Sequence, residues 1–135
     1  MSEPSDLSRP PIEGSLSARI DTIERGYEYL LAYAAQGRQD DKGSEARQAL
    51  TNMHRALDGL APLLAASLKA ASESGARDAE GFIEAITDDA RKARGAIGLV
   101  LSRPAISSLL VDNLNASIHL RALLTDVFLA EQALK

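Results

Sequence analysis

The chain has 135 residues, of which 45% are apolar, and a net charge of −4 from 19 acidic and 15 basic side chains. This length and composition are those of one globular domain and exclude a chain that is disordered throughout. The absence of cysteine excludes disulfides and thiolate chemistry, and the acidic balance without a basic tract argues against nucleic acid as a partner.

Residues 1–14 are predicted to form a flexible, disordered N-terminal tail, and residues 15–135 one helical domain. Ser, Pro, Glu and Asp dominate the tail. It holds no apolar core of signal-peptide length, and no apolar run elsewhere approaches the ~20 residues of a membrane span. We therefore expect a cytoplasmic protein without a membrane span. The eleven arginines against four lysines favour a GC-rich, bacterial genome.

A first helix is predicted to begin at Ser15 and to end near Gly37, a residue typical of helix C-termini. Its apolar residues recur at alternating steps of four and three, which is the spacing of one helix face. This row consists of Leu16, Ile20, Ile23, Tyr27, Leu30 and Ala34. The polar stretch 38–43 is predicted to be the turn that follows.

Three of the five aromatic residues of the chain lie within seven positions of this first helix. Tyr27 falls on the apolar row and is predicted to be a core residue. Tyr29 and Tyr33 lie four apart on another side, where Arg25 precedes Tyr29 by four. Arg25, Tyr29 and Tyr33 have the composition of an interface hot spot and are candidate partner-binding residues. A boundary position covered by the neighbouring helix explains them equally well.

A second helix is predicted to begin after Ser44, a good N-cap residue. Its row is Ala46, Leu50, Met53, Leu57, Leu60 and Leu64, with Leu68 one position late. Gly59 and Pro62 interrupt this pattern, and an interior proline removes a backbone donor at a cost of about 3 kcal/mol. We expect a kinked second helix, or a break with Pro62 in the first turn of a continuing helix.

A third helix is predicted between the polar stretch 72–75 and the stop at 102–104. It has the most regular row, which consists of Ala79, Ile83, Ile86, Ala90, Ala93, Ile97 and Val100. Gly95 and Gly98 lie beside this row, and small residues allow close packing of a neighbouring helix.

A fourth helix, predicted at about 104–133, is apolar around most of its circumference. One row consists of Leu109, Asn113, Ala116, Leu120, Leu123, Val127, Ala130 and Leu134. A second face holds Val111, Leu114, Ile118 and Leu129. Such a helix must be covered on more than one side, whereas each helix of a bundle normally buries one stripe. We therefore predict a homodimer interface at Val111, Leu114, Ile118 and Leu129.

The same helix carries a polar stripe formed by Asp112, Asn115, His119 and Asp126. A solvated stripe, a buried polar network and a ligand-orienting set remain open as explanations. Asn113 falls on the apolar row itself, where a lone asparagine often fixes helix register or oligomeric state.

The predicted fold is all-α, an antiparallel up-down-up-down four-helix bundle with a kinked second helix. Short connections favour antiparallel neighbours, and alternating β-branched runs are missing. A di-iron centre needs Glu-x-x-His pairs, but His54 and His119 follow Thr51 and Ala116 at that offset. We therefore expect no metal site and no cofactor.

Catalysis finds no positive support in the sequence, because no serine lies in a nucleophile elbow and no phosphate-binding loop follows a strand. We expect the protein not to be an enzyme. Residues 54–60, HRALDGL, are a poor match to a histidine phosphotransfer context, since aspartate stands where a lysine would pair with phosphate. A surface pair between His54 and Asp58 is the simpler interpretation.

The sequence therefore favours a non-enzymatic helical interaction module: an adaptor, assembly factor or regulator that self-associates through its fourth helix and binds an unidentified protein partner. The alternative is a small-molecule-binding bundle with a cavity near the kink in the second helix. That candidate ligand pocket would be lined by Tyr27, Met53 and His119. Phosphotransfer through His54 is the third hypothesis.

Overall fold

The computed structural model describes residues 15–71 and 76–135, which form six helices and contain no strand. The helices are α2 (Leu16–Ala34), α3 (Ala46–Leu57), α4 (Leu60–Ala71), α5 (Ala76–Leu101), α6 (Ser108–Ala116) and α7 (Ile118–Ala133). The all-helical prediction is confirmed. The prediction of four helices is not, because the second and fourth predicted helices are each divided into two. The predicted tail, 1–14, lies outside the described residues.

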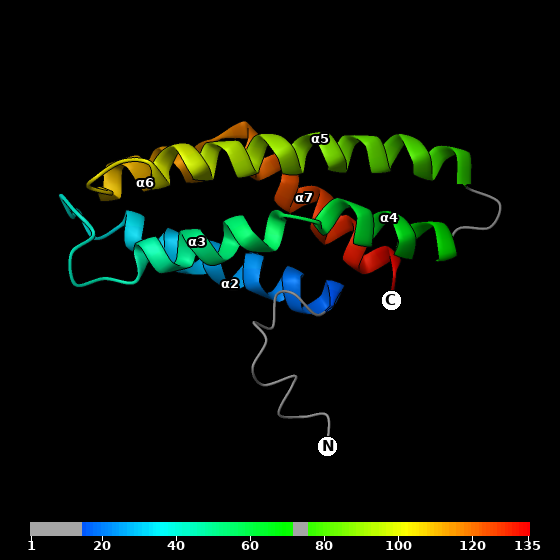
Figure 1. Ribbon diagram of the computed structural model, residues 1–135, viewed down its shortest axis with the longest axis horizontal. Coiled ribbons are helices and arrows are strands. Elements are labelled where there is room, and N and C mark those ends of the chain that lie inside the picture. The colour runs from blue at the N-terminus through cyan, green and yellow to red at the C-terminus, as the bar shows by residue number, and fades with distance from the viewer. Residues whose placement is uncertain (1–14, 72–75) are drawn as a thin grey trace, which may run out of the picture.

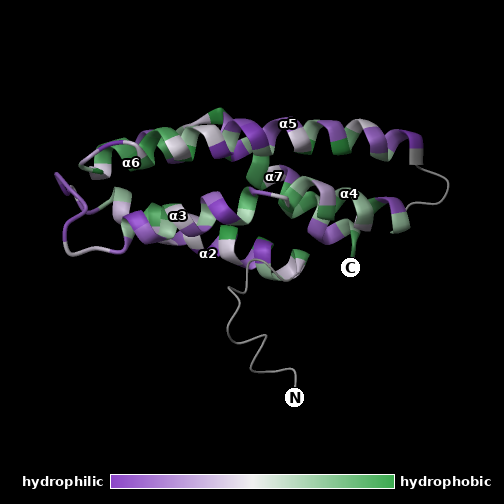
Figure 2. Ribbon diagram, in the orientation of Figure 1, coloured by the Kyte–Doolittle hydropathy of each residue, from purple (hydrophilic) through white to green (hydrophobic). Residues whose placement is uncertain are grey.

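The longest helix, α5, runs along the length of the molecule, and α3 and α4 follow one another beside it (Figure 1). Helix α2 packs against α3 and α6, whereas α7 packs mainly against α5. Hydrophilic and hydrophobic residues alternate along α3 and α5, as expected for helices that bury one face (Figure 2). The core lies between these elements.

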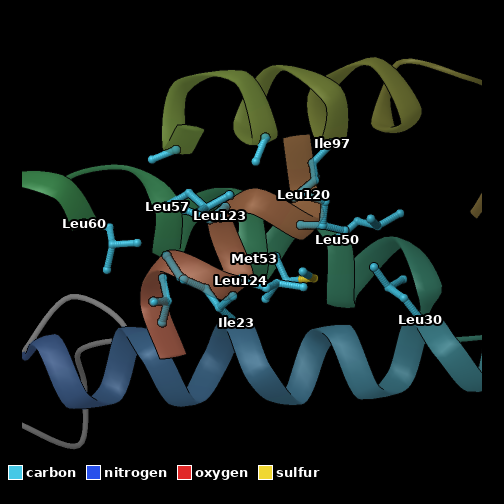
Figure 3. Close-up of a cluster of buried hydrophobic side chains, with 14 of the residues drawn as sticks. Ile23, Leu30, Leu50, Met53, Leu57, Leu60, Ile97, Leu120, Leu123 and Leu124 are labelled. Atoms are coloured by element: carbon cyan, nitrogen blue, oxygen red, sulfur yellow. The ribbon is translucent and has the colours of Figure 1, made fainter. Parts of the chain in front are cut away.

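The centre of the core is a layer of large aliphatic side chains drawn from most of the helices (Figure 3). Ile23 of α2, Leu50 of α3 and Leu123 of α7 are fully buried there. Met53 of α3 lies over Gly26 of α2, where a Cβ atom would be 2.4 Å from the methionine Cγ. The absence of a side chain at Gly26 therefore sets how closely α2 and α3 approach.

Helix α2 begins as predicted, because the Ser15 hydroxyl accepts a hydrogen bond from the Ala18 amide at 3.1 Å. Its buried face differs from the predicted row in one respect. Tyr33 is the fully buried ring, and Tyr27 is half-buried at the edge of the core. The buried face includes Gly26 and Tyr33. Helix α3 packs onto the glycine, and the loop after α2 and the loop after α5 both contact the tyrosine hydroxyl.

The second predicted helix is broken between α3 and α4. Gly59 adopts a φ of 82°, a left-handed conformation that does not continue an α-helix, and Pro62 lies in the first turn of α4. The Arg19 guanidinium caps the end of α3 by donating to the Ala56 carbonyl at 3.1 Å and to the carbonyl of Asp58. Of the two predicted outcomes, a break describes the structure better than a kink.

The fourth predicted helix is also broken, which the sequence pattern did not indicate. It begins at Ser108, not near residue 104, and it is interrupted at Ser117, where φ is −59° and ψ is 133°. The Ser117 hydroxyl then accepts from the His119 amide at 3.2 Å and caps α7.

This interruption explains why the predicted fourth helix is apolar all around: its two halves bury different faces. In α6 the buried apolar residues are Val111 and Leu114, and in α7 they are Leu120, Leu123, Leu124, Val127 and Ala130. The row predicted for one long helix therefore fits α7 only. Its members in α6, Leu109, Asn113 and Ala116, are exposed.

Candidate interaction sites

Tyr33, a predicted partner-binding residue, is instead enclosed by the loops at one end of the molecule. Its hydroxyl donates to the Ile106 carbonyl at 2.6 Å and lies 3.0 Å from the carbonyl of Asp40. Its ring stacks on Tyr29, with 6.2 Å between centroids, and burial raises the pKa of the Tyr33 phenol. Tyr33 therefore holds the fold together and is not available to a partner in this structure.

Asp41 and Arg47 also connect the loop after α2 with the loop after α5. The Asp41 carboxylate accepts from the Ile106 amide at 2.9 Å and from the Arg47 guanidinium at 3.1 Å. The hydrogen bond from the Ile106 amide is the main reason why the pKa of Asp41 is lowered. Arg47 also donates to the Leu101 carbonyl at 3.0 Å, so the loop after α2 and the loop after α5 are tied together.

Arg25 and Tyr29, the other two predicted partner-binding residues, line a surface groove of about 300 Å³ between α2 and α3. The opposite wall carries Glu45, Gln48 and Asn52. Arg25 is exposed and paired with Asp21 at 3.1 Å, and the Tyr29 hydroxyl accepts from the Glu45 amide at 3.0 Å. The structure thus brings Arg25 and Tyr29 to one groove, whereas Tyr33, although it stacks on Tyr29, is buried and does not line the groove.

The candidate ligand pocket at Tyr27, Met53 and His119 is not formed as a shared cavity in this structure. Met53 is fully buried against Gly26, whereas His119 is exposed in the first turn of α7. Tyr27 lies at the edge of the core. At the break itself the Arg19 guanidinium lies 3.7 Å from the position of a Gly59 Cβ.

His54, the candidate phosphoacceptor, lies half-buried between α3 and α5. Its Nε2 atom is 3.5 Å from the position of a Cβ on Gly98, so Gly98 makes room for the imidazole ring. Burial is the first cause that lowers the pKa of His54, and the nearby Arg94 is the second. A half-buried imidazole that fills a gap between two helices is poorly placed to receive a phosphoryl group.

The four predicted oligomer-interface residues divide into two pairs. Val111 and Leu114 of α6 are buried inside the chain, so they are not at its surface. Ile118 and Leu129 of α7 are 71% and 58% exposed, and the adjacent Phe128 is 44% exposed. Ile118, Ala122, Thr125 and Leu129 recur at steps of four, three and four and form one row, here called the α7 outer face.

The α7 outer face is less polar than its sequence suggests. The Thr125 hydroxyl donates to the Arg121 carbonyl at 2.9 Å, which satisfies the hydroxyl within the helix. A shallow groove of about 420 Å³ follows this face, and it is lined by Ile118, Arg121, Ala122, Thr125 and Asp126. One basic side chain, Arg121, and one acidic side chain, Asp126, therefore border this row.

Asp126 is a functional candidate. The polar stripe in the sequence included this residue but did not indicate its neighbour Asp89. Burial first, and then the neighbouring Asp89 carboxyl of α5, raise the pKa of Asp126 to about 7. Its Oδ2 atom is buried and receives no hydrogen bond from the described residues. No spacing in the sequence relates Asp89 to Asp126, because they lie on separate helices that meet only through packing. Of the other stripe residues, Asn115 is buried and donates to the Leu30 carbonyl at 3.1 Å.

Comparison with known proteins gives no further guide to these sites. No family model matches the chain, and searches of curated proteins and of solved structures find no significant match. Within residues 15–71 and 76–135, no helix is both long and apolar enough to cross a membrane. The same residues contain no group of three or more His, Asp or Glu side chains arranged to hold a metal ion.

Proposed function

We propose that this protein is a non-enzymatic helical interaction module that self-associates through the α7 outer face. The observation that carries the proposal is the exposure of Ile118 and Leu129 on one row of a helix whose opposite face is fully used by the core. Exposed apolar rows bordered by polar residues are typical of protein interaction sites. We also propose that α3–α4 and α6–α7 are two broken arms of an antiparallel four-helix bundle completed by α2 and α5.

A second copy of the chain is the simplest partner for this face. The row has the step pattern of a helix pair, and the face is bordered by both signs of charge, so it is complementary to itself. Sixteen residues give α7 a length of about 24 Å. One helix face of this length buries less than the ~800 Å² per partner of a standard interface, so a weak dimer is expected.

Sedimentation velocity over a range of concentrations tests this proposal directly. We expect a reversible dimer in the wild-type chain, and we expect Ile118→Asp and Leu129→Asp to shift it to monomer. Leu109→Asp is the matched control, because Leu109 is 69% exposed on α6 and lies outside the row. A monomeric wild type, or a dimer that survives both α7 substitutions, would contradict the proposal.

The groove between α2 and α3 is the second candidate site, for a different protein partner. Arg25 and Tyr29 line it together, and this residue pair is common in interface hot spots. A photo-crosslinking amino acid at Gln48, introduced in the native host, would label a partner bound there. We expect Arg25→Glu to abolish the labelled product and Arg77→Glu, at an exposed position of α5, to leave it unchanged.

A further inference from the structure

Asp126 lies at one border of the α7 outer face beside Asp89 of α5, and no Lys or Arg among the described residues forms a salt bridge with either carboxyl group. The buried Oδ2 atom of Asp126 has no hydrogen-bond donor among the described residues. Two carboxyl groups can share a hydrogen bond only if one of them keeps a proton. Asp126 as a residue is only partly buried and lines the shallow groove, so a positively charged group in the groove would lie beside its carboxyl group, although the Oδ2 atom itself is buried.

The chain itself carries a suitable cation at the other border of the same face. In the heptad notation of a helix pair, Ile118 and Thr125 occupy d positions, and Ala122 and Leu129 occupy a positions. Arg121 then occupies position g and Asp126 position e. Residues at e and g form the salt bridges between paired helices and set their orientation. Arg121 is exposed at its position.

The orientation of the pair follows from which positions face each other. In a parallel helix pair, the residue at position g of one helix faces the residue at position e of the following heptad on the other helix. These two positions are five residues apart in the sequence. Arg121 and Asp126 are separated by this interval. In an antiparallel pair, e faces e and g faces g, so the arginine and the aspartate would lie on different sides of the contact.

We propose that two copies of the chain pair in parallel along α7, with Arg121 of each copy bound to Asp126 of the other. This inference rests on the proposed self-association and adds its orientation and its charged contacts. The guanidinium of the second copy supplies a cation to the Asp126 carboxyl group where it borders the groove, whereas the Oδ2 atom stays buried inside the chain. Twofold symmetry produces the contact twice in each dimer.

A charge-exchange experiment tests this arrangement, with the dissociation constant of the full chain measured by sedimentation at pH 8 and low salt. Arg121→Glu and Asp126→Arg each place like charges opposite one another, so each should weaken the dimer roughly tenfold or more. The double variant restores opposite charges and should return to within about threefold of the wild type. Circular dichroism checks that every variant is folded.

Three further results separate the possible failures. A monomeric wild type overturns the proposed function itself, whatever the charge variants do. A wild-type dimer that Ile118→Asp disrupts, but that Arg121→Glu leaves unchanged, overturns only the charged contact. Weakening by His119→Ala would overturn the parallel orientation, because in an antiparallel pair His119, also at position e, would face Asp126. If Asp126→Arg does not fold, Asp126→Asn takes its place and should weaken the dimer.

Discussion

Gly26 and Met53 mark the closest contact between α2 and α3, since a Cβ on the glycine would lie 2.4 Å from the methionine Cγ and 2.6 Å from its sulfur. Gly26 is buried in the middle of α2, where glycine lowers helix stability by roughly 0.5–1 kcal/mol relative to alanine. The sequence tolerates that loss because α3, with its fully buried Met53, packs directly onto the glycine backbone.

Gly26→Ala should therefore destabilise the fold, although alanine is the better helix former. The added methyl group forces Met53 to move within a filled core, and such overpacking costs about 1–3 kcal/mol. Urea denaturation gives the free energy of unfolding. Gly95→Ala is the control: no atom lies within 4 Å of its Cβ position, so this variant should gain about 0.5–1 kcal/mol. Equal gains in both variants would contradict the close contact.

Tyr33→Phe should destabilise the fold because it removes the hydroxyl that joins the two loops. The Ile106 carbonyl, 2.6 Å from that hydroxyl, would lose its donor inside the structure, at a cost of about 1–3 kcal/mol. Thermal unfolding followed by circular dichroism measures the change. Tyr27→Phe, on the half-buried ring of the same helix, should stay within about 0.5 kcal/mol of the wild type. If both variants behave alike, Tyr33 does not have this role.

Gly59→Ala should destabilise the junction between α3 and α4. Gly59 has a φ of 82°, and this left-handed conformation costs a residue with a Cβ roughly 1–2 kcal/mol. Gly59→Asn should cost less, because asparagine adopts the left-handed region more readily than alanine does. The two variants are compared by urea denaturation. A larger loss with asparagine than with alanine would show that contact with Arg19, and not backbone conformation, decides the cost.

The raised pKa of Asp126 predicts how the free energy of unfolding of the single chain depends on pH. Its pKa is about 7 in the folded chain and near 3.8 in an unfolded one, because burial and Asp89 disfavour the charged form. The folded state therefore binds more protons between these values, so the free energy of unfolding should fall as pH rises from about 4 to about 7. Burial raises the pKa of Glu24 beside Glu131, which acts in the same direction, whereas the lowered pKa of His54 acts in the opposite direction.

Urea denaturation between pH 5 and pH 8, at concentrations where the chain is monomeric, measures this slope. Asp126→Asn should make the slope shallower, because the asparagine side chain does not titrate. Asp41→Asn is the control: the pKa of Asp41 is lowered, so its contribution is lost only as pH falls below about 4. An Asp126→Asn variant whose pH dependence equals that of the wild type would contradict the assignment.

The sequence by itself determined the helical content and most of the helix faces. The rows in α3 and α5 were predicted correctly because a periodic apolar pattern leaves few ways to bury a helix. Gly59 and Pro62 indicated the break in the second predicted helix, because each of them changes the backbone conformations that are accessible at its own position. For the same reason Ser15 was recognised as the start of α2.

Only the tertiary structure decided the break at Ser117, the burial of Tyr33 and the meeting of Asp89 with Asp126. Serine is compatible with a helix interior, so nothing in residues 104–133 distinguishes one helix from two. The break forms because α6 packs on α2 while α7 packs on α5, and one straight helix would have to bury both faces at once. The contacts of Tyr33 with Ile106 and of Asp126 with Asp89 join residues more than thirty positions apart in the chain, so no local spacing could have predicted them.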